Sequence, residues 1–138
     1  MDYNGCNARE GSNRGRVPKG ALSVLVVDDD DLIQSSMRAM LNVLGHTARI
    51  AASGEEALAE LEAGLVPDVV ILDLAMPGLG GERTLPLLRA LCPDVPVLVA
   101  TGRADAAVWQ LVAAHSFLIL LPKPFALDEL RQVLDSWA

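Results

Sequence analysis

The stretch that decides the fold is PDVVILDLAMPGLGG, residues 67–81. Within it, Val69–Leu72 is a continuous apolar run, which is typical of a strand covered on both faces by other elements. Asp73 follows this run directly, at the point where such a strand would end. A buried strand that ends on a carboxylate indicates a parallel sheet with polar groups along one edge.

Short apolar runs and longer amphipathic segments alternate on both sides of this stretch. The strands are expected at Ser23–Val27, Thr47–Ala51, Val69–Leu72, Val95–Ala100 and Phe117–Leu121. Helices are expected between them, at about 31–44, 53–64, Gly81–Leu91, Ala104–His115 and Leu127–Trp137. Five alternations of strand and helix predict an α/β fold, doubly wound, with a five-stranded parallel sheet and helices on both faces.

Polar side chains gather where the predicted strands end. Asp28 and Asp29 end the first strand, Asp73 the third and Thr101 the fourth, while the fifth runs into Lys123. Parallel strands place these ends at one edge of the sheet, where ligands bind. Three crowded carboxylates repel one another unless a cation joins them, and Mg²⁺ prefers oxygen ligands. A lysine and a hydroxyl beside such a cation suit an anionic phosphoryl group.

Charge and composition exclude several classes of protein. The chain has 138 residues, a length that favours one domain, and it is 51% hydrophobic, which is enough for a folded core. Its net charge is −7. Residues 1–20 hold four basic and two acidic side chains, so the excess of acid lies in residues 21–138. We expect 1–20 to be a flexible tail or linker and 21–138 to be the domain. So acidic a domain is a poor partner for nucleic acid.

The sequence also predicts where the protein works. No apolar run reaches the roughly 18 residues of a membrane span, and no signal peptide begins the chain. Cys6 and Cys92 lie far apart in the sequence and suggest no disulfide framework. We therefore expect a cytoplasmic protein with no membrane segment in this chain.

Four local sequences, in order, resemble the motif blocks of the receiver domain of bacterial two-component response regulators. These are VLVVDDDD, PDVVILDLAMPGLGG, PVLVATGR and LPKPF, and the resemblance covers about residues 22–138. It implies a flavodoxin-like sheet with strand order 2-1-3-4-5. It also implies a phosphorelay function, in which an aspartate accepts a phosphoryl group from a histidine kinase.

The resemblance assigns a Mg²⁺ site to four residues. Asp29 would bind the ion directly and Asp28 through water, while Asp73 and the backbone carbonyl of Ala75 would complete the protein ligands. Mg²⁺ is the one cofactor that this resemblance implies.

The resemblance also assigns the phosphate chemistry. Asp73 would be the phosphoacceptor, Thr101 the switch hydroxyl, and Lys123 the phosphate-binding lysine, with Gly102 beside the phosphate. Leu120 stands where many family members carry an aromatic residue, so no aromatic switch is expected there. Such a domain catalyses its own phosphorylation and dephosphorylation, and no separate effector enzyme domain is expected in this chain.

The expected partners are a histidine kinase phosphodonor domain and a downstream protein target or a second copy of the chain. The domain would act either alone or as the C-terminal receiver of a hybrid sensor histidine kinase. A phosphorylation-independent interaction module on the same fold is the alternative, and it would be marked by loss of an acidic or lysine residue. A flavin-binding protein ranks last, because Asp28–Asp31 would repel the flavin phosphate.

Overall fold

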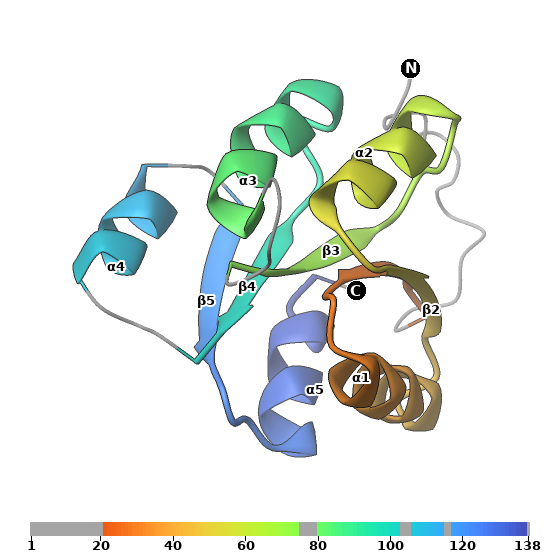
Figure 1. Ribbon diagram of the computed structural model, residues 1–138. Coiled ribbons are helices and arrows are strands. Elements are labelled where there is room, and N and C mark those ends of the chain that lie inside the picture. Colours follow the sequence, from red (N-terminus) through yellow and green to blue (C-terminus); the bar gives the residue numbers. More distant parts are fainter. Residues whose placement is uncertain (1–20, 75–79, 103–105, 115–116, 138) are drawn as a thin grey trace.

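Five parallel strands form one sheet in the order β2-β1-β3-β4-β5 (Figure 1). The computed structural model describes residues 21–74, 80–102, 106–114 and 117–137. The strands are β1 Ser23–Val27, β2 Thr47–Ala51, β3 Val69–Asp73, β4 Val97–Thr101 and β5 Leu118–Pro122. The helices are α1 Asp31–Val43, α2 Gly54–Glu62, α3 Gly80–Leu91, α4 Ala106–Ala113 and α5 Leu127–Asp135. The predicted fold class and strand order are confirmed.

The strand bounds agree with the prediction for β1 and β2 and differ by one or two residues elsewhere. Strand β4 begins at Val97, and the preceding Pro96 has no N–H to donate to a neighbouring strand. Strand β5 begins after Phe117, whose φ of 59° lies in the left-handed region and cannot continue a strand. The ends of the predicted helix Ala104–His115 lie outside the described residues. Residues 1–20 also lie outside them, so the predicted domain boundary stays a prediction.

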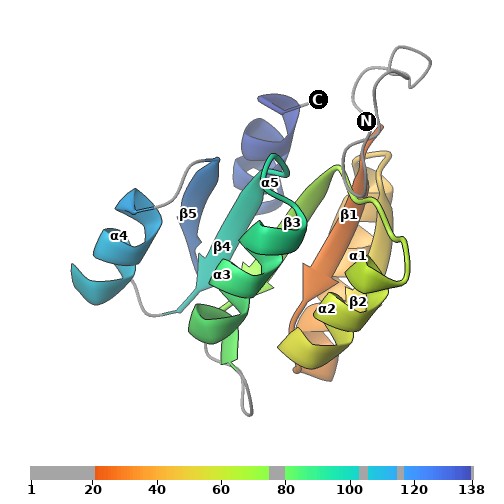
Figure 2. The ribbon, with the colours of Figure 1, turned by 90° about the horizontal axis from the view of Figure 1, so that it is seen from above.

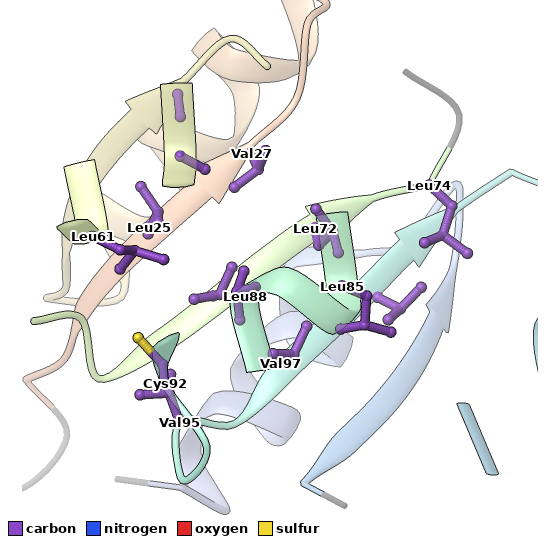
Figure 3. Packing of buried hydrophobic residues seen from close by; sticks show 14 of the residues in the cluster. Leu25, Val27, Leu61, Leu72, Leu74, Leu85, Leu88, Cys92, Val95 and Val97 are labelled. Carbon is purple, nitrogen blue, oxygen red and sulfur yellow. The ribbon is translucent and has the colours of Figure 1, made fainter. Parts of the chain in front are cut away.

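Helices lie on both faces of the sheet (Figure 2). The sheet divides the hydrophobic core into two clusters, one on each face. Helices α1 and α5 cover one face, where Met37 and Leu41 of α1 pack against strand residues such as Val26. Helices α2, α3 and α4 cover the other face (Figure 2), where Leu61 of α2 and Leu88 of α3 belong to the same cluster as Leu25 of β1 (Figure 3). Alternate residues of β1 serve the two faces: Val24 and Val26 belong to one cluster, Leu25 and Val27 to the other. The strands are thus held rigidly from both sides.

Cys92, at the end of α3, is fully buried in the α2–α4 cluster (Figure 3). It is disulfide-bonded. The sequence, with two distant cysteines and no disulfide framework, did not predict this bond. No helix within the described ranges has the length and hydrophobicity that crossing a membrane requires.

His46, between α1 and β2, is a buried structural residue with a pH-dependent contact. Its Nδ1 accepts the N–H of Leu22 at 3.0 Å, which requires the neutral imidazole. Burial lowers the pKa of His46, and the charge of Asp135 opposes this only in part. The neutral form is therefore favoured in the folded state.

We expect this histidine to make folding stability fall on acidification. Since its folded pKa is depressed below about 6.5, its contribution is present above that pH and lost as pH falls through the folded value. Urea unfolding of wild type and His46→Gln between pH 7.5 and 5 measures this. The difference in free energy of unfolding between the two proteins should shrink toward pH 5. A difference that stays constant with pH would show that His46 does not cause the loss of stability.

Candidate functional site

The carboxyl edge of the sheet carries an acidic cavity of about 680 Å³. Its lining is acidic apart from one cation and one apolar residue: Asp28, Asp29, Asp30, Asp31, Asp73, Ile33 and Lys123. These residues come from the ends of β1 and β3, from the start of α1, and from the segment that follows β5. The cavity therefore lies where the topology of a doubly wound sheet places a ligand.

Lys123 joins two buried carboxylates that are far apart in the sequence. Its Nζ lies 3.1 Å from Asp28 Oδ2 and 3.7 Å from Asp73 Oδ1. Asp28 is 3% exposed and Asp73 is 7% exposed, whereas the lysine side chain is 22% exposed. Because both carboxylates are withdrawn from water, the ammonium supplies the positive charge that their burial requires.

The backbone of Lys123 is held as well as its side chain. Its N–H donates to the carbonyl of Thr101 at 2.7 Å, so the end of β4 positions the segment that carries the lysine. The peptide bond between Lys123 and Pro124 is cis. The ammonium is thus held at the sheet edge by a backbone contact in addition to its ion pairs.

Asp28 is fixed at each of its polar groups. Its N–H donates to Ala51 of β2 at 3.1 Å, and its Oδ1 accepts the N–H of Asp30 at 2.9 Å. Its Oδ2 meets Lys123, and its carbonyl accepts from Gln34 Nε2 at 2.7 Å. Both carboxylate oxygens of Asp28 therefore already have partners within the protein.

Three carboxylates converge in this cavity. Asp28, Asp29 and Asp73 each offer an oxygen, and these oxygens lie within 4.8 Å of one another. Asp29 differs from the other two because its side chain is exposed. Hard oxygen donors at this spacing suit a small divalent cation such as Mg²⁺, which keeps several of its waters and needs few protein ligands.

Asp30 and Asp31 serve the start of helix α1. The Asp30 side chain accepts the N–H groups of Leu32 and Ile33, at 2.8 and 3.2 Å, and so caps the helix. Asp31 lies in the first turn, where a negative charge interacts favourably with the helix dipole. These two acidic residues therefore have a structural role that is separate from the three converging carboxylates.

The other residues that the sequence predicted for the site are not among the described residues that line the cavity. Thr101 is 1% exposed at the end of β4, and Gly102 after it is exposed; neither is among the described residues that line the cavity. Ala75 lies outside the described residues. Leu120 is buried in β5, packed in the cluster beneath α2, α3 and α4. The structure thus brings together Asp28, Asp29, Asp73 and Lys123.

Two residues near the site were not predicted from the sequence. A Cβ at Gly81 would lie 2.2 Å from the carbonyl oxygen of Asp73, so the start of α3 can approach the end of β3 only with glycine there. Gln34, which contacts Asp28, is the other. A signal for Gln34 was available, because this polar residue shares a helix stripe with the buried Met37 and Leu41.

The fold and the cavity together define a flavodoxin-like α/β domain with an acidic, lysine-bearing site at the carboxyl edge of its sheet. Residues 24–135 match the response regulator receiver domain family. The chain belongs to this family.

Individual relatives support this membership. The response regulator MprA of Mycolicibacterium vanbaalenii is 40% identical over 107 residues, which is 78% of this chain and 46% of that protein. The chain therefore spans a little under half the length of the curated relatives that it matches. The response regulator TrrA of Thermotoga maritima, solved in complex with Mg²⁺ and BeF, superposes with a TM-score of 0.74 at 28% identity, covering 84% of this chain and 98% of that one.

A third relative is the receiver domain of a sensor histidine kinase from Pseudomonas aeruginosa, solved with a magnesium ion coordinated in its active-site cleft. It superposes with a TM-score of 0.76 at 28% identity, covering 85% of this chain and 97% of that one. The family thus includes receivers of response regulators and receivers of sensor kinases.

Proposed function

We propose that this domain accepts a phosphoryl group on Asp73, in a Mg²⁺-dependent transfer from a phosphohistidine of a histidine kinase. The observation that carries the proposal is the contact of one lysine with two buried carboxylates, Asp28 and Asp73, at the carboxyl edge of the sheet. This arrangement offers a nucleophilic carboxylate, an acidic cation site and a fixed positive charge in one cavity.

In the proposed step, a carboxylate oxygen of Asp73 attacks phosphorus while the bond between phosphorus and the donor histidine nitrogen breaks. The imidazole leaves with the electron pair of that bond, and Asp73 becomes an acyl phosphate. Lys123 lies 3.7 Å from Asp73 Oδ1, close enough to pair with the new phosphate oxygens. Thr101, with Gly102 after it, is proposed to donate to a phosphate oxygen from the end of β4.

Asp28, Asp29 and Asp73 are the residues proposed to hold Mg²⁺, with the carbonyl of Ala75 as a further ligand. The ion would neutralise charge on the incoming phosphoryl group. Asp29 is the exposed member of the set and the one proposed to bind directly, whereas both oxygens of the Asp28 carboxylate already have partners. The fit rests on three oxygens within 4.8 Å of one another.

The partners follow from the same chemistry. The phosphodonor is a histidine kinase domain, and the phosphorylated state shifts a conformational equilibrium that a downstream protein or a second copy of this chain detects. The proposed setting is the cytoplasm. Residues 21–138 are proposed as the receiver, with 1–20 leading into it.

The test is intact mass spectrometry after incubation with acetyl phosphate and Mg²⁺. The wild-type protein should gain one phosphoryl group, and EDTA should abolish the gain, because the cavity without a cation repels the donor anion. A folded protein that binds Mg²⁺ and still gains no mass from acetyl phosphate or a kinase would favour the phosphorylation-independent interaction module instead.

A further inference from the structure

Gln34 connects helix α1 to the end of strand β1. It lies in the first turns of α1, half-buried, and its Nε2 donates to the carbonyl of Asp28 at 2.7 Å. The acceptor is a backbone oxygen, so the contacting side-chain atom must be the amide nitrogen. The bond therefore runs from a side chain of the helix to the loop that carries the acidic residues.

This bond acts on the peptide unit between Asp28 and Asp29. The carbonyl of Asp28 belongs to that planar unit, so holding the oxygen fixes the direction in which the chain enters Asp29. The side chain of Asp29 is exposed. Few packing contacts restrain an exposed side chain, so the direction of its Cα–Cβ bond, which the backbone sets, limits where its carboxylate can reach.

We propose that Gln34 is a positioning residue of the cation site: by holding the Asp28 carbonyl, it keeps Asp29 directed toward Asp28 and Asp73 before an ion binds. The inference rests on the proposed function, since it concerns the same Mg²⁺ site. Mg²⁺ demands near-ideal geometry, and a site ordered in advance avoids the cost of ordering its ligands on binding. Gln34 itself contributes no ligand atom.

A purely structural role for Gln34 predicts something different. Were the bond only an anchor for α1, its loss would lower stability with or without a cation, and would lower phosphorylation at every Mg²⁺ concentration. Helix α1 has other anchors, namely the Asp30 cap and the buried Met37 and Leu41. A positioning role therefore appears as weaker cation binding in a protein that remains folded.

The test compares Gln34→Met with wild type. Methionine matches glutamine in length and helix propensity but has no N–H to donate. Gln110→Met on α4, an exposed glutamine, is the matched control. The dissociation constant for Mg²⁺ is measured by calorimetric titration, thermal unfolding is followed in EDTA, and phosphorylation by acetyl phosphate is measured across a range of Mg²⁺ concentrations.

Gln34→Met should bind Mg²⁺ about fivefold to tenfold more weakly, the change expected for one lost hydrogen bond. Its phosphorylation should return to the wild-type level once Mg²⁺ is saturating, because Asp73 and Lys123 are unchanged. Gln110→Met should match wild type throughout. Gln34→Ala removes the same donor and gives a second measurement should the methionine variant fold poorly.

Three results would overturn the inference. Equal Mg²⁺ affinity in wild type and Gln34→Met would refute the positioning role and leave the proposed function standing. Phosphorylation that stays low at saturating Mg²⁺, with a lower unfolding temperature in EDTA, would show a structural role. Wild-type protein that binds no Mg²⁺ would refute the proposed cation site, and the inference with it.

Discussion

Asp73→Asn should reduce phosphorylation by acetyl phosphate to background, at least a hundredfold below wild type, while the protein stays folded. Asparagine keeps the size of the buried side chain but is not nucleophilic at its amide, so no acyl phosphate can form. The substitution leaves Lys123 paired with Asp28 at 3.1 Å. Intact mass spectrometry measures the gain of phosphate, and circular dichroism checks the fold.

Asp94→Asn is the matched control for this experiment, since Asp94 is an exposed aspartate in the turn between α3 and β4. It should label like wild type. Label that persisted in Asp73→Asn on any other residue would contradict the assignment of the phosphoacceptor. Loss of phosphorylation in both variants would mean that removing any negative charge prevents labelling, and would not identify Asp73 as the phosphoacceptor.

Lys123→Met should destabilise the protein by about 2 kcal/mol in EDTA, because it removes the cation that faces two buried carboxylates. The estimate lies below that for a fully buried pair, since the lysine side chain is 22% exposed. Mg²⁺ should stabilise this variant more than it stabilises wild type, because a bound ion then supplies the positive charge that Lys123 gave to both carboxylates. Urea unfolding with and without Mg²⁺ measures both effects.

Arg49→Met provides the comparison with an exposed ion pair. Arg49 lies 2.6 Å from Glu60, and its side chain is 60% exposed, so its loss should cost well under 1 kcal/mol. Mg²⁺ should not alter that cost. Were the two variants equally stable, the proposed importance of Lys123 for the buried carboxylates would be wrong.

The topology and most of the site could be predicted because both depend on local patterns. Continuous apolar runs marked the buried strands, and the residues directly after them marked the edge where ligands bind. That rule placed Asp28, Asp29, Asp73, Thr101 and Lys123 at one edge of the sheet. The described residues that line the cavity include all of these except Thr101, and the roles of the five residues stay predictions. The fold could be predicted from the hydrophobic periodicity of each segment and from the order in which strands and helices alternate.

Other features depended on contacts that no local pattern describes. Gln34 reaches a carbonyl of the preceding loop, and Gly81 meets the backbone of β3. The start of β5 is set by Phe117, whose carbonyl accepts hydrogen bonds from Val97 and Arg89. Each of these depends on how two elements meet in space, which propensity and periodicity do not determine.

The packing of the core on two separate faces has a consequence for how such a chain can evolve. Each strand sends alternate side chains to the two clusters, so the sheet lies between two sets of packing constraints. Substitutions beneath α2, α3 and α4 share few neighbours with those beneath α1 and α5, so their energetic effects should be nearly additive. One side of the domain can therefore diversify its sequence while the other, with the acidic loop that precedes α1, stays unchanged.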